Sequence, residues 1–483
     1  MIRKLQTAGR RLCALLTAAA VLAMTPGVSA QAVTANGAIA RGIDVSKHNG
    51  AVNWGQVAGT GINFTFIKVG STKSGVDPQF AANITGAQAA GLRTGVYLYS
   101  YAVTPEQAAE EARLVLQWIE PYTVNYPIVF DIEDKCHKNL SSQELIDIIN
   151  AFCTAIDAAG YYPMVYSYKN MFTGKLSNVG WDKWVAQYDD ACDYNNNVCF
   201  WQYSSHGSVN GVGGRVDVNY QYKDYSQLII PEGFIGHNGS VRFYRNWKMQ
   251  KGWVDYNNTR YYLDGAGNLV SGWLTDADGR IYYLSPQDGS IARGQCAVDG
   301  ANYYFTAEGV KTAGWVVLED KKYFYDPAGN GAMKTDWYSD ESGNFYFFDR
   351  AKGFILTGAQ VIDGANYMFS PEGIRMSGMI AAADGSYYYD PASGQMVRGW
   401  FETAGKTCFA DAAGHVVTGL YEIEKQLYFF DETGALIRNQ TLELNGKTYT
   451  SSPEGILTEV IPAEVIPAEG APEQSAAQTA PAA

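Results

Sequence analysis

Two acidic side chains that follow an apolar run are the most chemically informative residues in this chain. Residues Ile128 to Phe130 have the composition of a buried strand, and Asp131 and Glu133 come directly after them. Because side chains alternate across a strand, Asp131 and Glu133 share one face and Ile132 points away from it. Two carboxyl groups held together at the end of a core strand resist simultaneous ionisation, so one is expected to have a raised pKa. Such a pair suits general acid catalysis with a carboxylate partner, as in glycoside hydrolysis.

The elements that must position this pair lie between residues 38 and 225, where strand-like runs alternate with helical segments. Eight runs have strand character: Gly42–Val45, Phe64–Val69, Gly95–Tyr101, Ile128–Ile132, Pro163–Tyr166, Trp184–Gln187, Cys199–Tyr203 and Val216–Tyr220. Three of the gaps between strands carry helix signals. One helix is predicted to begin with an N-cap and first-turn proline at Asp77-Pro78 and to end at Gly91. The other two are predicted to begin with capping boxes at Thr104 and Ser141. The later gaps are too short for complete helices. We therefore predict an α/β fold, an irregular (β/α) barrel, for this half of the chain.

In a barrel of this kind the chemistry takes place at the C-terminal ends of the strands. Asp44 ends the first predicted strand, and Asp217 comes early in the eighth. Closure of the barrel makes these two strands neighbours, so Asp217 can approach Asp44 and share one mouth with Asp131 and Glu133. Aromatic side chains, whose faces can stack on sugar rings, are expected around this mouth as substrate-binding residues: Tyr97, Tyr99, Tyr166, Tyr188 and Trp201.

Four short motifs, in order along the barrel, resemble those of a known enzyme family. They are Arg41–Ser46, the Asp131-x-Glu133 pair, Trp201–Tyr203 and Val216–Asn219. Together they are similar to the successive motifs of glycoside hydrolase family 25, whose members are lysozymes. The resemblance implies N-acetylmuramidase activity on the β-1,4 bond between N-acetylmuramic acid and N-acetylglucosamine. It also implies that Glu133 is the general acid, with Asp131, Asp44 and Asp217 as supporting carboxylates.

Some details of this chemistry stay open at the level of the sequence. Asp131 could attack the anomeric carbon, or it could stabilise an intermediate formed by the acetamido group of the substrate. Residues Lys68 to Thr72 depart from the family pattern, which more often has Lys-Ala-Thr-Glu-Gly there, so an acid that contacts substrate is missing. An Asp-x-Glu pair at a strand end could also bind a divalent cation, as in a metal-dependent hydrolase. A non-catalytic wall adhesin is the alternative from another class, but a binding barrel has no need to concentrate acids.

From Gly252 to about residue 460 the chain consists of about ten repeats, each opening with a dipeptide such as Gly-Trp and continuing through a polar turn to an aromatic strand. Each repeat predicts a β-hairpin too small to bury its own face, so an all-β solenoid of stacked hairpins is expected over residues 251–460. The repeats resemble choline-binding and glucan-binding cell-wall repeats, which implies choline or another wall polymer as partner. Aromatic faces attract a quaternary ammonium group, and the candidate wall-ligand residues are Trp253, Trp273, Tyr282, Trp315 and Trp337. Because consecutive tryptophans occur only in units one and two and in units four and five, we expect two aromatic cages.

The remaining segments predict an exported protein. Residues 1–30 read as a signal peptide with a basic start and an apolar core, residues 226–250 as a linker, and residues 461–483 as a disordered Pro/Ala-rich tail. No further apolar stretch suggests a membrane span, and a net charge of −13 disfavours nucleic acid as a partner. Cys192 and Cys199 could close a short loop as a disulfide, whereas no cysteine or histidine spacing matches a zinc site, so no metal or other cofactor is expected. We therefore expect a secreted, wall-associated enzyme of a Gram-positive-type envelope, with peptidoglycan strands as its main partner.

Overall fold

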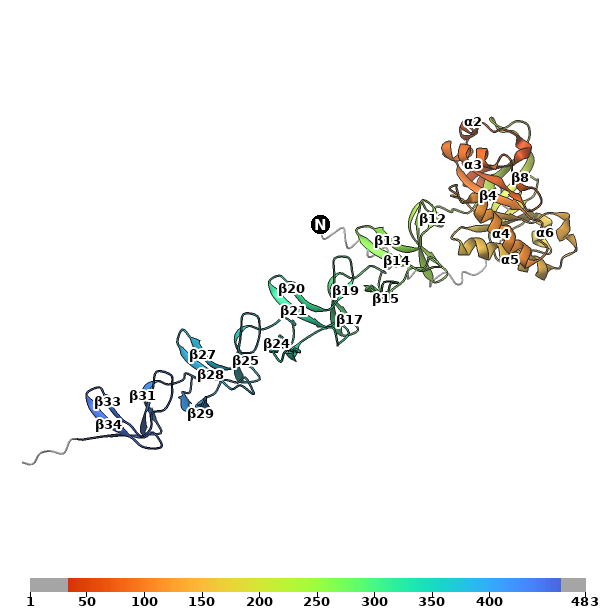
Figure 1. Cartoon of the computed structure of the whole chain (residues 1–483). Coiled ribbons are helices and arrows are strands. Elements are labelled where there is room, and N and C mark those ends of the chain that lie inside the picture. Colours follow the sequence, from red (N-terminus) through yellow and green to blue (C-terminus); the bar gives the residue numbers. More distant parts are fainter. Residues whose placement is uncertain (1–33, 462–483) are drawn as a thin grey trace, which may run out of the picture. The chain divides into compact units, whose positions relative to one another are not determined.

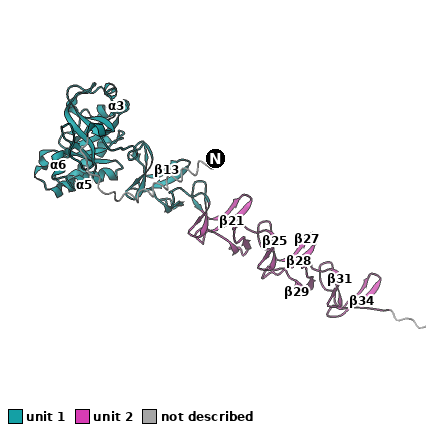
Figure 2. Cartoon of the chain, turned by 180° about the vertical axis from the view of Figure 1, so that it is seen from behind, with its two compact units in different colours: residues 1–294, 305–311 teal, residues 295–304, 312–483 magenta. Residues whose placement is uncertain are grey.

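The computed structural model describes residues 34–461, so the predicted signal peptide and nearly all of the predicted tail lie outside the described residues. The chain divides into two compact units, residues 1–294 with 305–311 and residues 295–304 with 312–483 (Figure 2). The division falls within the repeats rather than at their start. No helix between residues 34 and 461 is both long enough and apolar enough to cross a membrane.

The first unit begins with a closed barrel of eight strands, in the order β1-β9-β8-β7-β6-β5-β4-β2, with β2 paired back to β1 (Figure 1). The strands are β1 (Ala40–Val45), β2 (Phe64–Ser71), β4 (Arg93–Tyr99), β5 (Ile128–Asp131), β6 (Pro163–Tyr168), β7 (Lys183–Ala186), β8 (Val198–Gly207) and β9 (Val216–Gln221), with a short β3 (Gly75–Val76) beside β2. All eight predicted strands are present. Neighbouring strands are parallel except that β9 runs antiparallel to both β1 and β8. The α/β barrel prediction is confirmed.

Helices cover the outside of this barrel. They are α2 (Trp54–Ala58), α3 (Phe80–Ala89), α4 (Pro105–Ile119), α5 (Ser142–Ala158) and α6 (Lys169–Thr173), and three 3-10 turns lie at Ala35–Gly37, Lys47–Asn49 and Lys135–Asn139. Thr104 and Ser141 cap α4 and α5 as predicted. Helix α3 starts later than expected, because Gln79 is its N-cap. The carboxylate of Asp77 instead accepts hydrogen bonds from the backbone N–H groups of Lys47 and Gln79, at 3.1 and 2.9 Å.

Alternation along the strands separates two cores. Phe64 and Phe66 point into the barrel with the interior aromatic side chains, whereas Ile67 packs in the layer between sheet and helices. The interior rings come so close to neighbouring strands that glycine is required beside them. A Cβ on Gly42 would lie 2.3 Å from the Phe64 ring, and one on Gly95 would lie 2.5 Å from the Phe66 ring.

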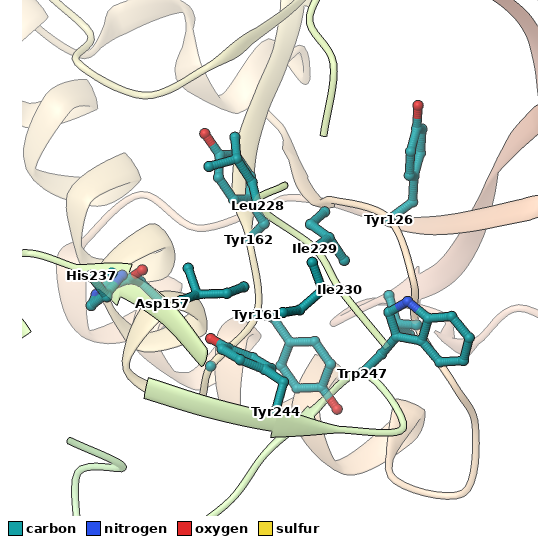
Figure 3. A pocket seen from close by; sticks show the side chains of 14 residues that line it. Tyr126, Asp157, Tyr161, Tyr162, Leu228, Ile229, Ile230, His237, Tyr244 and Trp247 are labelled. Carbon is teal, nitrogen blue, oxygen red and sulfur yellow. The ribbon is translucent and has the colours of Figure 1, made fainter. Parts of the chain in front are cut away.

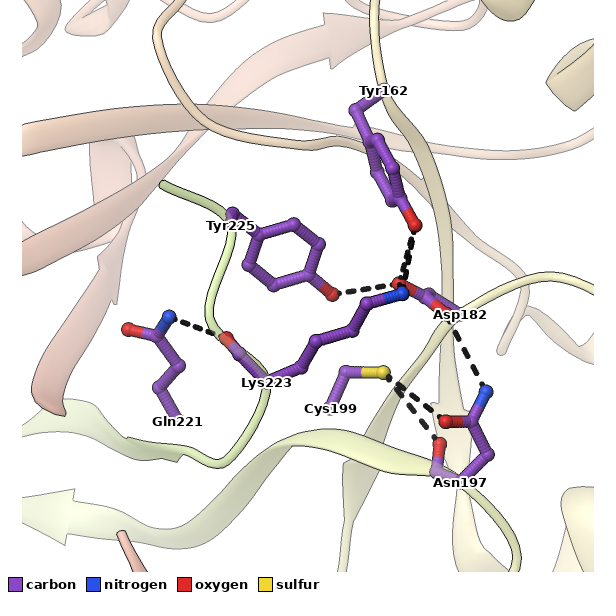
Figure 4. A network of polar contacts seen from close by, with 7 residues as sticks. All are labelled: Tyr162, Asp182, Asn197, Cys199, Gln221, Lys223 and Tyr225. Carbon is purple, nitrogen blue, oxygen red and sulfur yellow. Dashed lines mark hydrogen bonds and ion pairs between the residues drawn. The ribbon is translucent and has the colours of Figure 1, made fainter. Parts of the chain in front are cut away.

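A polar network closes the barrel at the N-terminal ends of the strands (Figure 4). The Asp182 carboxylate, just before β7, accepts hydrogen bonds from the hydroxyls of Tyr162 and Tyr225 at 2.8 and 2.9 Å. It also forms an ion pair with Lys223 at 2.7 Å. Because Lys223 and Tyr225 follow the last barrel strand, this network fixes the exit of the chain from the barrel.

Residues 226–250 form structure where the sequence predicted a linker. Strands β10 (Glu232–His237), β11 (Ser240–Arg245) and β12 (Lys248–Met249) make a three-stranded sheet. Asn238 and Gly239 both have positive φ at the tip of the β10–β11 hairpin, whereas Gly233 and Gly236 lie within β10. Phe234 and Phe243 then pack with the first repeat hairpin. The linker prediction is corrected accordingly.

The sheet β10–β12 packs against the barrel in the first unit. The Arg242 guanidinium donates to the Asp157 carbonyl at 2.9 Å, and the His237 ring lies 3.0 Å from the Asp157 carboxylate. Lys248 donates to the Glu120 carbonyl at 2.8 Å. A small cavity of about 80 Å³ lies in this junction, lined mainly by tyrosine and isoleucine side chains (Figure 3).

Two-stranded hairpins make up the rest of the chain, so the hairpin-repeat prediction is confirmed. They are β13 (Gly252–Tyr256) with β14 (Thr259–Leu263), β15 (Gly272–Thr275) with β16 (Ile281–Leu284), β17 (Gly294–Val298) with β18 (Ala301–Phe305), β20 (Gly314–Leu318) with β21 (Lys321–Asp326), β23 (Asp336–Ser339) with β24 (Phe345–Phe348), β25 (Gly358–Ile362) with β26 (Ala365–Phe369), β27 (Gly378–Ala382) with β28 (Gly385–Tyr389), β29 (Gly399–Thr403) with β30 (Lys406–Ala410), β31 (Gly419–Ile423) with β32 (Gln426–Phe430), and β33 (Thr441–Leu444) with β34 (Lys447–Ser451). Short strands β19 (Lys311–Thr312), β22 (Ala332–Met333) and β35 (Leu457–Glu459) extend some of them. The chain after one hairpin returns to the hairpin before it; for example, Leu436 N–H donates to the Thr407 carbonyl at 2.8 Å.

Candidate active site and aromatic clusters

A polar cleft of about 430 Å³ opens at the C-terminal ends of the parallel barrel strands. Asp44 lies near the end of β1, Asp131 ends β5, and Glu133 follows two residues later. Asp217 joins them because β9 is antiparallel, so the beginning of β9 lies at the same rim as the ends of the other strands. In the β1–β9 register Asp217 stands directly opposite Asp44. The structure thus brings all four predicted acids to one cleft.

Asp44 is held by two side-chain amides. Its Oδ1 accepts hydrogen bonds from Gln202 Nε2 at 3.0 Å and from Asn219 Nδ2 at 2.8 Å. The side-chain oxygen Oε1 of Gln202 in turn accepts hydrogen bonds from the hydroxyls of Tyr166 and Tyr188, at 2.9 and 3.0 Å. These bonds fix which end of the Gln202 amide faces Asp44. Burial, followed by the charge of Asp217, raises the pKa of Asp44.

Asp131 and Glu133 each keep one oxygen without a protein partner. Among the described residues, Asp131 Oδ1 and Glu133 Oε2 are buried and have no hydrogen-bond partner. Burial, and next the charge of Glu133, raises the pKa of Asp131 well above its ordinary value. Burial also raises the pKa of Glu133, while a hydrogen bond with Tyr168 acts in the opposite direction. The pair can therefore retain one proton where an exposed acid would have lost it.

Lys68, on β2, places a positive charge in the same cleft. Its Nζ lies 4.6 Å from the centre of the Tyr99 ring and 5.9 Å from that of Tyr97. The charge of Lys68 lowers the pKa of both Asp131 and Glu133, and so opposes the effect of their burial. Lys68 therefore helps to keep one of the two carboxyls ionised.

Four of the five aromatic residues predicted to bind substrate line the cleft: Tyr97, Tyr99, Tyr166 and Tyr188. The prediction for Trp201 is wrong. Phe200 and Gln202 point into the barrel, so Trp201 between them points outward and packs in the core beneath the helices. It is 1% exposed, and its ring N–H donates to the Gln187 carbonyl at 2.7 Å.

Sequence reasoning missed several residues of the cleft. Four of these residues line the cleft: Lys68, Tyr168, Trp184 and Gln202. A fifth, Asn219, donates a hydrogen bond to Asp44. Strand alternation could have identified Asn219, because it lies two residues from Asp217 and so on the same face, but it assigns Gln202 to the face opposite Trp201. The side chain of Tyr168 follows the last buried position of β6, and no pattern in the sequence marks it.

The cysteines between residues 34 and 461 are all free thiols, including Cys192 and Cys199. A disulfide between these two is prevented by their positions, since Cys192 packs in the outer core and Cys199 inside the barrel. Within the same residues, no group of three or more His, Cys, Asp or Glu side chains is arranged to hold a metal ion.

The tryptophans of the repeats form a recurring aromatic cluster. Each packs on the aromatic residue opposite it in its own hairpin and on an aromatic residue from the second strand of the next hairpin. The five clusters are Trp253 with Tyr262 and Tyr282, Trp273 with Tyr283 and Phe305, Trp315 with Phe324 and Tyr346, Trp337 with Phe347 and Tyr367, and Trp400 with Phe409 and Tyr428. Their ring centroids lie 4.8–6.1 Å apart.

These clusters do not require tryptophans in consecutive repeats, because the residue from the next hairpin is a tyrosine or phenylalanine. Trp400 has the same kind of surroundings as Trp253, with Tyr428 at 5.2 Å, although the repeats beside it lack tryptophan. The described residues contain five clusters of this kind, and the two ligand cages stay a prediction.

Comparison with known proteins gives matches to both parts of the chain. Residues 43–212 match the family described as glycosyl hydrolases family 25, and residues 356–401 match a choline-binding repeat. The uncharacterized protein YegX of Escherichia coli is 32% identical over 191 residues, which are 37% of this chain and 68% of YegX. Lysozyme M1 of Streptomyces globisporus is 29% identical over 197 residues, 37% of this chain and 66% of that enzyme. The solved structure of the modular autolysin LytC from Streptococcus pneumoniae aligns with a TM-score of 0.35 at 30% identity, over 38% of this chain and 46% of LytC.

Proposed function

The chain belongs to glycosyl hydrolase family 25, and we propose that its barrel hydrolyses the β-1,4 bond between N-acetylmuramic acid and N-acetylglucosamine in peptidoglycan. One observation carries this proposal, namely the two buried, unpartnered oxygens of Asp131 and Glu133 in a polar cleft. Oxygens in that state have a hydrogen-bonding capacity that the protein leaves for a substrate. The presence of lysozymes among the relatives supports the same reaction.

Glu133 acts as the general acid in this proposal. Burial raises its pKa, so the carboxyl keeps a proton that it can give to the leaving glycosidic oxygen. Asp131 carries the negative charge that the oxocarbenium-like transition state requires. It does so either as the nucleophile or as the stabiliser of an intermediate made by the substrate's own acetamido group.

Asp44 and Asp217 support this pair through their charges, which act on the pKa of Asp131 and of Glu133 respectively. The two amides that bind Asp44 hold it rigidly, and its pairing with Asp217 keeps negative potential at the rim. The tyrosines beside them offer faces for sugar rings and hydroxyls for hydrogen bonds. Tyr188 and Tyr168, which are 51% and 41% exposed, form the outer part of the cleft.

The repeats retain the enzyme at the cell wall in this proposal. Their aromatic clusters suit a quaternary ammonium group such as choline, and the matched choline-binding repeat supports that chemistry. Retention raises the local concentration of glycan strands for the barrel. The enzyme would be secreted, in keeping with the predicted signal peptide.

The experiment that tests the reaction is digestion of purified peptidoglycan, followed by borohydride reduction and mass spectrometry of the fragments. The wild type should release fragments with new reducing-end muramic acid. Glu133→Gln should lose this activity by a factor of at least about 100, because the amide cannot donate the proton. Binding of the variant to insoluble walls should be unchanged.

Glu120→Gln is the matched control, since Glu120 is exposed at the end of α4. It should digest peptidoglycan as the wild type does. Full activity of Glu133→Gln would refute the assignment. Intact glycan strands with the wild type would favour the wall adhesin, and activity abolished by a chelator would favour the metal-dependent hydrolase.

A further inference from the structure

A second pocket, of about 530 Å³, lies beside the catalytic cleft. Its walls are Thr72 and Lys73, which follow β2, the segment after β4, and the first two turns of α4. Because β2 and β4 are parallel barrel strands, these segments lie at the same rim as the cleft. Tyr99 lines the cleft and Tyr101 lines the pocket, and the centroids of their rings are 5.2 Å apart. The pocket therefore begins where the cleft ends.

A buried carboxylate fixes the walls of this pocket. Glu111, on α4, is 1% exposed. Its Oε2 accepts a hydrogen bond from the Ser100 hydroxyl at 2.6 Å. Its Oε1 accepts from the Thr72 hydroxyl at 3.1 Å and from the Tyr101 N–H at 3.0 Å. One side chain thus ties the segments after β2 and β4 to the helix, so the chain itself holds the pocket in shape.

Lys73 brings a positive charge to the pocket. Its Nζ lies 3.5 Å from the centre of the Tyr101 ring, and among the described residues it has no ion-pair partner. Its charge also reaches the edge of the cleft. Although burial acts in the opposite direction, hydrogen bonds, chiefly from Cys136, and the charge of Lys73 lower the pKa of Asp134. Because Asp134 directly follows Glu133, the pocket and the proposed general acid are close neighbours.

The carboxylates that line the pocket already have partners. Glu111 has the three hydrogen bonds described above, and Glu110 accepts two from the Arg113 guanidinium, both at 2.7 Å. Glu106 lies in the first turn of α4, where a hydrogen bond with its own backbone N–H lowers the pKa of its carboxyl. Lys73 is thus the charged group that is left to pair with a ligand, so the pocket suits an anion.

The substrate of the proposed function, on which this inference rests, offers such an anion. The lactyl group of N-acetylmuramic acid carries a short peptide, and this peptide has free carboxylates. We infer that the pocket binds this peptide and that Lys73 pairs with one of its carboxylates. Two or three extended peptide residues span about 7–11 Å, which is enough to lead from a sugar in the cleft past the two tyrosine rings.

Gln107 gives the pocket a second contact for a peptide. Its side-chain oxygen accepts a hydrogen bond from the Val103 N–H at 2.8 Å, so its NH₂ group is the end that can donate to a peptide carbonyl. Lys73 recognises the charge of the ligand, and Gln107 its backbone. The enzyme should therefore prefer glycan strands that carry their peptides over bare glycan.

A comparison of two soluble substrates tests this preference. One is uncross-linked glycan with its peptides, and the other is the same glycan stripped by an amidase that cleaves the bond between lactyl group and peptide. The measured quantity is the ratio of kcat/KM for the first substrate to that for the second. Lys73→Gln should lower this ratio about fivefold, the upper end for a partly exposed ion pair, whereas Lys73→Arg should keep it within about twofold of the wild type.

Lys138→Gln is the matched control, because Lys138 is an exposed lysine of the barrel that lines neither the cleft nor the pocket. Its ratio should equal that of the wild type. A third substrate, whose peptide carboxylates are amidated, should give the same kcat/KM with Lys73→Gln as with the wild type. An unchanged ratio in Lys73→Gln would overturn the inference, and so would an equal loss on the amidated substrate.

The stripped glycan separates this inference from the proposed function. If the wild type cleaves it and Lys73→Gln shows the wild-type ratio, the muramidase assignment stands and the peptide site is wrong. If the wild type cleaves neither substrate, the proposed function fails and the peptide site fails with it.

Discussion

At the scale of single residues, the cleft places two carboxyl groups of unequal surroundings beside one lysine. Asp131 is 3% exposed, whereas Glu133 reaches the cleft and contacts Tyr168. Burial raises the pKa of both, and Lys68 opposes that rise. The site therefore has one proton and one negative charge over a range of pH in which two exposed acids would both be ionised.

This proton sharing predicts a bell-shaped dependence of kcat/KM on pH. Activity should fall at high pH as the coupled pair loses the proton that Glu133 must donate, and at low pH as the pair gains a second proton. Because the hydrogen bond from Tyr168 lowers the pKa of Glu133, Tyr168→Phe should raise that pKa and move the alkaline limb upward, by up to about one pH unit. The measurement is a kcat/KM profile on soluble glycan fragments.

The control for that profile is Tyr188→Phe, since Tyr188 bonds Gln202 rather than Glu133. Its alkaline limb should stay within a few tenths of a pH unit of the wild type. A shift of the alkaline limb to lower pH in Tyr168→Phe would contradict the assignment of that limb to Glu133.

At the scale of elements, the barrel depends on close contact between β1, β2 and β4. Gly95→Ala on β4 would place a Cβ 2.5 Å from the Phe66 ring and 2.7 Å from the Pro127 carbonyl, which is backbone and cannot rotate away. The free energy of unfolding should fall by about 1–3 kcal/mol. Thermal unfolding followed by circular dichroism measures the loss.

Gly55→Ala on α2 is the matched control for this substitution. Its Cβ would lie 3.6 Å from the Asn53 side chain, an ordinary contact, and alanine favours helix by up to about 1 kcal/mol over glycine. Equal unfolding midpoints for Gly95→Ala and the wild type would show that the barrel has more room than the distances indicate.

The elements also show which features the sequence could predict. Apolar runs bounded by turns identified all eight barrel strands, because burial on both faces leaves a strong signal. The antiparallel direction of β9 carries no such signal, although it decides that Asp217 reaches the cleft. Trp201 was expected at the mouth as an aromatic residue of a barrel strand, whereas alternation beside Phe200 points it outward.

At the scale of the whole molecule, the first unit joins the barrel to the sheet β10–β12. Arg242→Met removes the charged hydrogen bond to the Asp157 carbonyl, which keeps only its bond from the Gly160 N–H, so the first unit should lose about 1–3 kcal/mol of stability. The activity remaining after heating should fall at a lower temperature than in the wild type. Before heating, the activity should be unchanged, because the cleft lies elsewhere.

Arg398→Met is the comparison for this prediction. Arg398 likewise donates to a carbonyl, that of Ala412 at 2.9 Å, but it belongs to the second compact unit. The thermal loss of barrel activity should be the same in this variant as in the wild type. Equal losses in both variants would mean that β10–β12 contributes nothing to the stability of the barrel.

The attachment of β10–β12 has a consequence for the reach of the enzyme. This sheet contacts Asp157 and Glu120, at the C-terminal ends of α5 and α4, and these helix ends lie beside the beginnings of the parallel strands. The cleft lies at the opposite ends of the same strands. The contacts that hold β10–β12 and the residues of the cleft therefore lie at opposite ends of the barrel strands, so this attachment leaves the cleft uncovered.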